Sequence, residues 1–113
     1  MIILDKPITL DELNVMKDNF FGDMVKGVVD IEKGLLSLDA ELHCDLEKML
    51  LENDSNQEAL WGINLYPDME GEDFIEFDSM INIRPWQGNR NRYVEDEATR
   101  EAIIKIVDKF IER

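Results

Sequence analysis

Three of the five arginines in this chain lie in one short segment, IRPWQGNRNR, at residues 83–92. They are Arg84, Arg90 and Arg92, and they stand out because the chain as a whole has a formal net charge of −14. A guanidinium group has planar N–H donors that match two oxygens of a phosphate or carboxylate at once. The segment therefore predicts either a loop that binds an anion or a loop that neutralises its own acidic neighbours.

Both interpretations of this segment stay open at the level of sequence. Ordinary ion pairs between exposed arginines and acids are worth only about 0–1 kcal/mol each. If the side chains instead converge on an anionic ligand, the candidate ligand-binding residues are Arg84, Gln87, Asn89, Arg90, Arg92, Asn82 and Trp86. Trp86 follows a proline and is hard to bury. We expect its ring to anchor a partner, to stack on a ligand or to fold over the sheet edge.

Two acidic residues on a predicted strand and the sole histidine are the candidates for acid–base catalysis. Glu76 and Asp78, at positions i and i+2, project to one face about 6.5–7 Å apart. That spacing suits a divalent cation or an acid–base pair, and equally two unrelated exposed acids. His43 is the only side chain with an ordinary pKa near neutrality. The candidate catalytic residues are therefore Asp78, Glu76 and His43.

We predict no cofactor and no metal site. His43 is next to Cys44, but adjacent residues on a helix point apart, and zinc needs three or four ligands. We expect Cys44 to be a small buried or half-buried side chain. The sequence has no Walker loop, dinucleotide-binding glycine pattern, serine elbow or paired CxxC motif.

The length and composition are typical of an ordinary globular domain spanning residues 1–113. Hydrophobic residues make up 44% and charged residues 34% of the chain, which is enough to build one core at this length. A single cysteine forms no intramolecular disulfide, which favours the reducing cytoplasm. The segment MIILDKPITL lacks the basic and apolar regions of a signal peptide, and no apolar run approaches the ~20 residues of a membrane span.

The charge balance restricts the partners that we expect. An excess of 26 acidic over 12 basic residues repels nucleic acids and anionic membranes. A nucleic-acid partner would need a local basic patch, and only the segment around residues 84–92 provides one. We therefore expect a cytoplasmic protein whose possible partners are a small anionic ligand, another protein or a second copy of the chain.

Hydrophobic periodicity predicts alternating helices and strands in the first half of the chain. After an extended arm at residues 1–8, a helix is expected over 9–22, with Thr9 as its N-cap and Glu12 completing a capping box. Apolar and polar residues then alternate over 24–39, which predicts a β-hairpin.

Helices with a single apolar stripe are also predicted in the middle and at the end of the chain. The middle helix is expected over 39–54, with Asp39 as its cap and Asn53 in the left-handed position at its end. The final helix is expected over 95–113 with Asp96 as its cap, and its acids precede its bases as the helix dipole favours. Its apolar stripe is formed by Ile103, Ile104, Val107, Phe110 and Ile111.

Two further strands form a second predicted hairpin. The first is expected over 60–68, with Trp61 on the core face. The second, over 74–84, has the clearest alternation in the chain and places Phe74 on the polar side. Pro85 ends this strand because proline cannot donate to the ladder.

The order of elements is helix, hairpin, helix, hairpin, helix. It predicts an α+β fold with a four-stranded, mainly antiparallel sheet made of two hairpins, and about three helices packed on one face. The opposite face would be open and polar, with the arginine loop (residues 84–92) beside it. The side chains expected on that open face are Lys26, Asp30, Glu32, Asn64, Tyr66, Glu76, Asp78, Asn82 and Arg84.

Three blocks of the sequence resemble those of a family of small, uncharacterised prokaryotic domains of unknown function. They are ELHCDLEKMLLEND, LWGINLYPD and FIEFDSMINIRPWQGNRNRYVED, and the resemblance runs from about Gly22 onward. Its most specific part is the run from Asp78 to Pro85 followed by Gln87 to Arg90. The chain departs from the family pattern at Trp86 and Tyr93, where smaller residues are expected, and this weakens a ligand-stacking role for Trp86. The resemblance implies no activity, cofactor or catalytic residue.

Three functions are compatible with these patterns. The first is a small cytosolic binding module, whose open sheet face and arginine loop bind an anionic ligand or a partner. The second is a small enzyme, in which the acids or the histidine named above do acid–base work while Arg84 and Arg90 hold an anionic substrate. The third is a structural homodimer, in which WQGNRNR packs against the partner subunit. A polar cleft beside the loop favours ligand binding, whereas a flat apolar contact favours the dimer.

Overall fold

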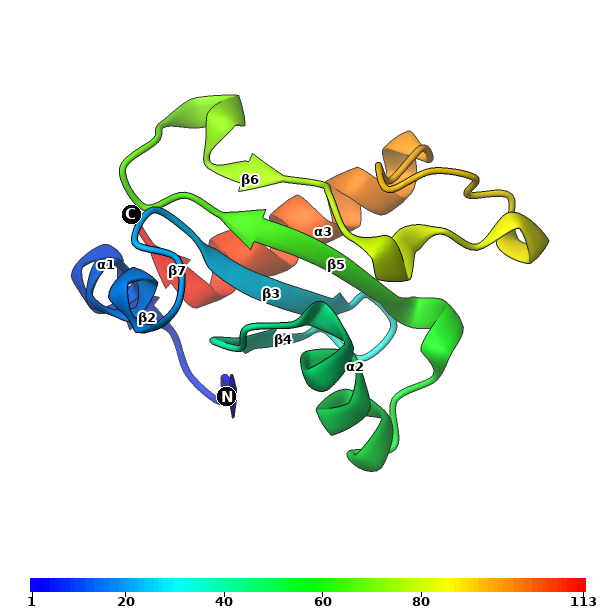
Figure 1. The fold of residues 1–113 in the computed structure, drawn as a ribbon, viewed down its shortest axis with the longest axis horizontal. Helices are drawn as coiled ribbons and strands as arrows, with labels where there is room; N and C mark the ends of the chain where they lie inside the picture. Colours follow the sequence, from blue (N-terminus) through cyan, green and yellow to red (C-terminus); the bar gives the residue numbers. More distant parts are fainter.

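Strand β3 (Val25–Asp30) is the centre of the sheet. The computed structural model, which describes residues 1–113, pairs it antiparallel with β4 (Leu35–Leu38) on one side and with β5 (Leu60–Leu65) on the other (Figure 1). The hairpin predicted over 24–39 is confirmed as β3 and β4. All six residues of β3 pair with β5, so the two hairpins join through these strands.

The sheet has five strands, in the order β1-β4-β3-β5-β6, rather than the predicted four. The additional strand β1 (Ile2–Ile3) pairs with β4 at one edge, and β6 (Ile75–Glu76) pairs with β5 at the other. A separate two-stranded parallel sheet joins β2 (Ile8–Thr9) to β7 (Ile111–Glu112). The strand count was wrong because β1 has only two residues, too few to show a period of their own.

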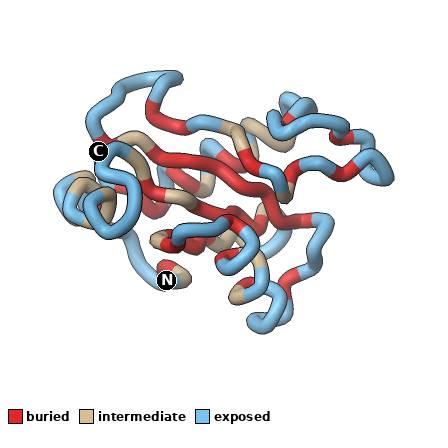
Figure 2. Tube along the Cα trace, viewed as in Figure 1, coloured by how far each residue is buried: buried red, intermediate tan, exposed pale blue.

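The three helices cover both faces of the sheet, so their predicted placement on one face is wrong. Helices α1 (Leu10–Met16) and α3 (Glu97–Phe110) pack on one side, and α2 (His43–Glu52) packs on the other (Figure 1). The neighbouring residues Val28 and Val29 are both fully buried but belong to separate apolar clusters. Since successive strand residues point to opposite faces, β3 has a core on each side, and all its residues except the half-buried Lys26 are buried (Figure 2).

Helix α2 covers part of the face that we expected to be open. Leu46 and Leu50 of this helix pack in one cluster with Val28 of β3. Asp30, expected on the open face, is fully buried, and its carboxylate accepts a hydrogen bond from the hydroxyl of Ser55 (2.6 Å). This part of the face is therefore a second core rather than an open polar surface.

The predicted N-caps of the first and last helices are confirmed. The hydroxyl of Thr9 accepts the backbone N–H of Glu12 (3.1 Å), and the carboxylate of Asp96 accepts that of Thr99 (2.9 Å). Helix α1 ends at Met16 and continues as a 3-10 turn, so it is shorter than predicted. None of the helices is long and apolar enough to cross a lipid bilayer.

Both predicted ends of the middle helix are wrong. Helix α2 begins after Leu42. Asp39 does not cap it, because its φ is +77° and its carboxylate accepts hydrogen bonds from the side chain of Asn19. At the other end, the left-handed residue is Asp54 (φ +69°), one position beyond Asn53.

The strand predicted over 74–84 is wrong beyond Glu76. The chain leaves the sheet there and forms two 3-10 turns, η4 (Met80–Asn82) and η5 (Pro85–Gln87). Phe74, expected on the polar side, is fully buried. The alternation of apolar and polar residues predicted the wrong structure here, because this segment buries polar side chains and exposes apolar ones. The buried polar residues are Ser79, Asn82 and Arg84, and the exposed apolar residues are Met80 and Ile83.

The side-chain amide of Asn82 takes the place of the missing strand beside β5. Its Oδ1 accepts the N–H of Gly62 (2.8 Å), and its Nδ2 donates to the carbonyl of the same residue (2.9 Å). These two bonds reproduce those of a hydrogen-bonded pair in an antiparallel ladder. Without them, each buried polar group of Gly62 would cost about 1–3 kcal/mol.

Position 62 has no room for a side chain, because a Cβ there would lie 2.5 Å from the Cβ of Ser79. We expect Gly62→Ala to lower the free energy of unfolding by about 1–3 kcal/mol, since η4 must move. Gly27→Ala on β3 is the matched control, with a smaller expected loss, because its nearest neighbour is the flexible end of Leu38 at 3.1 Å. Urea unfolding of both variants measures the difference. Equal losses would contradict the role given to the Ser79 contact.

Candidate functional site

The guanidinium group of Arg84 is enclosed by protein, with only 1% of the residue exposed. All five of its N–H donors have acceptors, which come from α2, from β5 and the turn before it, from η4 and from the loop itself. They are Ile81 O (2.9 Å from Nε), Gln57 O and Gln87 Oε1 (2.9 and 3.4 Å from Nη1), and Leu60 O and Glu47 Oε2 (from Nη2). Arg84 therefore attaches the loop to the body of the protein and has no N–H left for a ligand.

Glu47 is the charged partner of Arg84, with 3.4 Å between Oε2 and Nη2. Burial raises the pKa of Glu47 and lowers the pKa of Arg84, and the attraction between the two charges opposes both shifts. The ring of Trp61, buried on the core face as predicted, lies 4.9 Å from the guanidinium carbon. Breaking a buried pair from one side is costly because the other charge stays in the interior.

Asn89 holds the arginine loop in shape from inside. Its Nδ2 donates to the carbonyls of Asn82 (2.7 Å) and Tyr93 (2.7 Å), and its Oδ1 accepts the N–H of Glu95 (2.8 Å). Its backbone also forms an isolated antiparallel bridge with Arg84. The predicted ligand-binding amides of Asn82 and Asn89 are thus buried, and both are engaged within the protein.

The outer part of the arginine loop carries three more of the predicted ligand-binding side chains. Gln87 donates from Nε2 to the carbonyl of Glu58 (3.0 Å), and Trp86 projects into solvent with 75% of its surface exposed. The guanidinium group of Arg90 has no hydrogen bond, although its backbone N–H donates to the carboxylate of Glu95 (2.6 Å). None of these three side chains lines the groove described below.

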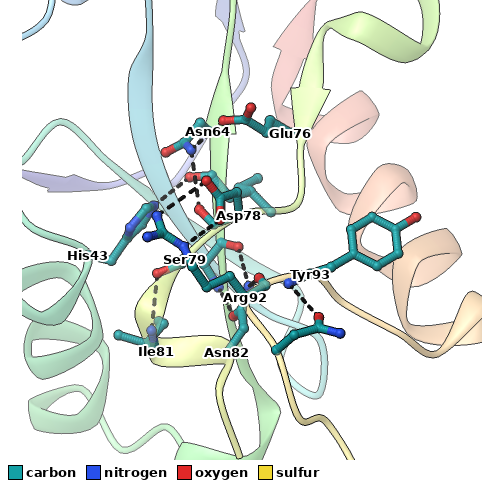
Figure 3. Close-up of polar contacts among 12 residues, drawn as sticks. His43, Asn64, Glu76, Asp78, Ser79, Ile81, Asn82, Arg92 and Tyr93 are labelled. Carbon is teal, nitrogen blue, oxygen red and sulfur yellow. Dashed lines mark hydrogen bonds and ion pairs between the residues drawn. The ribbon is translucent and has the colours of Figure 1, made fainter.

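Of the three loop arginines, Arg92 is the one that pairs with an acid of the second hairpin. Its Nε donates to Oδ1 of Asp78 (2.7 Å) and its Nη2 to Oδ2 (3.2 Å), so the pair is bidentate (Figure 3). Both side chains are partly exposed, and such a pair adds little to stability. Its effect is positional, because it holds the returning chain beside the end of β6.

A groove of about 1460 Å³ lies between β6, residues 91–93 and α3, and we call it the β6–α3 groove. It lies at the sheet edge, not between the arginine loop and an open sheet face, and its lining combines apolar, acidic and basic side chains. Its lining is apolar or aromatic (Tyr66, Met69, Ile75, Phe77, Tyr93, Ile104), acidic (Glu72, Asp73, Glu76, Asp78) and basic (Arg92, Arg100, Arg113), with Gly71 and Asn91.

Arg100 differs from the other two arginines of the groove in having no carboxylate partner. Arg92 and Arg113 each form an ion pair with an aspartate. Arg100 donates from Nη1 to the backbone carbonyls of residues 94 (2.7 Å) and 95 (2.9 Å), whereas its Nε and Nη2 make no hydrogen bond. Its guanidinium carbon lies 5.1 Å from the ring centroid of Tyr93. Arg100 is therefore a positioned positive group with unused donors beside the groove.

Sequence reasoning missed Arg100 and Ile104 as groove residues. The periodicity of the final helix assigned Ile104 to its buried stripe, but 38% of this residue is exposed. The available signal was the i, i+4 spacing, which places both side chains on one face of a helix. The sequence alone does not say which structure that face meets.

His43 lies near Asp78 and Ser79 (Figure 3), but it is not among the residues that line the groove. Its Nε2 is 2.8 Å from the carbonyl oxygen of Ile63, and because a carbonyl only accepts, Nε2 carries the proton of the neutral ring. Burial lowers the pKa of His43 to about 4, although the hydrogen bond to Ile63 opposes the shift. At neutral pH the ring is therefore uncharged and donates to the backbone of β5.

The carboxylates of Glu76 and Asp78 have different partners. Glu76 accepts hydrogen bonds from Nδ2 of Asn64 (2.8 Å) and from the hydroxyl of Tyr66 (3.0 Å), while Asp78 is held by Arg92. Burial, together with the bond to Glu76, raises the pKa of Tyr66 to about 12. Both acids are thus engaged as acceptors within the protein.

Cys44 is exposed, which corrects the expectation of a buried or half-buried thiol. The reason is helical phase, since His43, Leu46 and Leu50 face the sheet and the next residue after His43 turns away from it. No group of three or more His, Cys, Asp or Glu side chains is arranged to hold a metal ion.

The fold and the groove define a small α+β domain whose sheet is covered by helices on both faces and has a groove along one edge. The chain belongs to the family described as "Protein of unknown function (DUF5674)", whose model matches residues 2–110. This confirms the family of small uncharacterised domains indicated by the sequence and extends the match to the N-terminal arm. No curated protein and no solved structure matches the chain.

We expect Arg84→Lys to lower the free energy of unfolding by at least about 2 kcal/mol, because an ammonium group cannot supply five planar donors to the enclosed acceptors. Arg90→Lys is the matched control, with an expected change within about 0.5 kcal/mol, because the Arg90 side chain has no partner. Urea unfolding of both variants provides the measurement. A loss at position 84 no larger than at position 90 would show that the enclosed network is not stabilising.

The pH dependence of stability should report on His43. Its folded-state pKa of about 4 lies below the ordinary 6.5, so its contribution is complete above pH 6.5 and is lost as the pH falls towards 4. We expect the wild type to lose about 2 kcal/mol more than His43→Gln between pH 7 and pH 5. Urea unfolding at both pH values measures this, and parallel pH dependences in the two proteins would contradict it.

Proposed function

We propose that this protein is a binding module and that the β6–α3 groove binds a ligand or partner carrying an anionic group. The observation that supports the proposal is that Arg92 and Arg100 line the same groove and retain unbonded N–H donors. Arg84, by contrast, is enclosed and saturated, so we do not include it in the binding surface. The proposal keeps the anion-binding role of the arginine loop but moves it to the side of the loop that faces α3.

Arg100 is the better placed of the two for direct contact. Two backbone carbonyls and the ring of Tyr93 already hold its guanidinium group in one position, so little conformational entropy is lost when an anion binds. The residue is half-buried, and partial exclusion of water strengthens a charge-assisted hydrogen bond. Arg92 can add its free Nη1 while it stays paired with Asp78.

The acid–base interpretation has less support from the geometry. His43 is neutral, buried and outside the groove, and Glu76 and Asp78 are engaged as acceptors. The homodimer interpretation would rely on the exposed ring of Trp86, and the oligomeric state in solution distinguishes it from the binding module. We therefore give the anion-binding groove as the conclusion.

Titration of the isotope-labelled protein with phosphate and with citrate, followed by amide chemical shifts at fixed ionic strength, tests this function. We expect shifts at residues 75–78, 91–93 and 100–104, with about 10-fold or greater weakening in Arg100→Gln, because a hydrogen bond to a charged group contributes about 1.5–3 kcal/mol. Arg90→Gln is the matched control and should bind as the wild type does. Shifts that map to residues 86–90, or equal weakening in both variants, would place the anion elsewhere. If neither anion changes the amide chemical shifts, the proposed function is wrong.

A further inference from the structure

We infer that the occupant of the β6–α3 groove is an extended peptide of another protein, which pairs with the outer edge of β6 and presents a carboxylate to Arg100. This inference rests on the proposed function, because it concerns the same groove. Peptides add to a free sheet edge through main-chain hydrogen bonds, while side-chain contacts provide the specificity.

The outer edge of β6 has main-chain groups available for such a peptide. In an antiparallel ladder, every second residue of a strand bonds to its neighbour and the residues between point the other way. Since the N–H of Tyr66 donates to the carbonyl of Phe74 (2.9 Å), Ile75 and Phe77 belong to the outward set. Phe77 directly follows β6 and extends this edge by one residue, and its N–H and carbonyl have no partner in the protein. Strand β6 is also the last in the sheet order and forms its border in Figure 1.

The size of the groove favours a peptide over a small molecule. Pockets for small ligands usually enclose about 300–1,000 Å³, whereas this groove is open and has a volume of about 1460 Å³. Its lining includes Arg100 near the start of α3 and Arg113 beyond its end, so it follows the length of the helix. A long open groove beside a strand edge fits a chain that contacts it at successive positions.

Apolar surface in the groove is arranged for side chains that point from an added strand towards α3. Ile104 lines the groove with 38% of its surface exposed, and Tyr93 with 48%. The ring of Tyr93 packs edge-on against that of Phe77, with 6.1 Å between centroids, which fixes this wall. A large apolar side chain on Ile104 would cover surface that the protein itself leaves in water.

The spacing of Arg100 and Ile104 predicts a sequence pattern in the peptide. Four residues of α-helix rise about 6 Å, and alternate side chains on one face of a strand lie about 6.5–7 Å apart. An acidic residue two positions from a large apolar residue can therefore meet both groove residues at once. We expect the acidic residue of the peptide to contact Arg100, because this arginine of the groove has no carboxylate partner in the protein.

Selection from a phage-displayed library of random ten-residue peptides on the wild-type protein tests the inference. We expect enrichment of the pattern acidic–any–apolar, or its reverse, with dissociation constants in the micromolar range. Fluorescence polarisation with a labelled selected peptide should show at least 10-fold weaker binding to Ile104→Glu and to Arg100→Gln, and unchanged binding to Trp86→Ala. Selected peptides that depend on Trp86 and not on Ile104 would overturn the inference.

Strand addition has a test on the peptide, which avoids any effect on folding of the protein. N-methylation of the peptide amide that faces β6 should abolish binding, whereas N-methylation of the next amide, which faces away, should leave it within about two-fold. The amide of Phe77 should also exchange with solvent at least 10-fold more slowly in the complex. Equal tolerance of both methyl groups, or an unprotected Phe77 amide, would exclude pairing with β6.

Failure of this inference is distinguishable from failure of the proposed function. If phosphate or citrate binds in an Arg100-dependent way but the library yields no enriched peptide, the groove binds an anion and the peptide inference is overturned. If the Phe77 amide is already protected from hydrogen exchange without peptide, and this protection rises with protein concentration, the occupant of the groove is a second copy of the chain. That result would overturn the peptide inference.

Discussion

The hydrogen bonds between the side-chain amide of Asn82 and the peptide groups of Gly62 shape the second half of this fold. Strand β5 has six residues, but β6 pairs with only two of them. The polar groups of Gly62, next in the ladder, lie in the interior, where unpaired donors and acceptors are costly. Asn82 meets them from a 3-10 turn, so the chain can leave the sheet after Glu76 while the ladder stays complete.

Once the chain has left the sheet, the arginine loop depends on buried polar side chains for its shape. Arg84 binds carbonyl and carboxylate oxygens of residues that precede the loop, and Asn89 joins the two limbs of the loop. Apolar packing contributes little here, since Trp86 and Met80 are exposed. The result is that Arg92 and Tyr93 return beside the end of β6 and form one wall of the groove.

Burial separates the arginines into different physical roles. Arg84 is an interior anchor, Arg90 is free in solvent, and Arg92 and Arg100 are positioned at the groove. A net charge of −14 opposes anions at long range, but that field is screened over about 8 Å at physiological salt. Whether an anion binds is therefore decided by the guanidinium donors and edge amides that the fold leaves unpaired.

Sequence and structure agree where interactions are local in the chain. The caps at Thr9 and Asp96 bond three residues onward, and the hairpin of β3 and β4 is set by alternation over a few residues. The burial of Trp61 follows from the same alternation in β5. The gathering of Arg84, Arg90 and Arg92 in one loop is likewise plain from the sequence, because the three residues are neighbours along the chain.

Tertiary structure decided which helices share a face and which arginine is buried. Consecutive valines at positions 28 and 29 fit a strand that is covered on one side or on both, so the sequence did not place α2 opposite α3. The acceptors of Arg84 at Gln57, Leu60 and Glu47 lie 24 to 37 residues before it, and no local pattern signals them. A charged side chain is stable in the interior only when distant parts of the chain bring enough partners to replace water, and that condition becomes visible only in three dimensions.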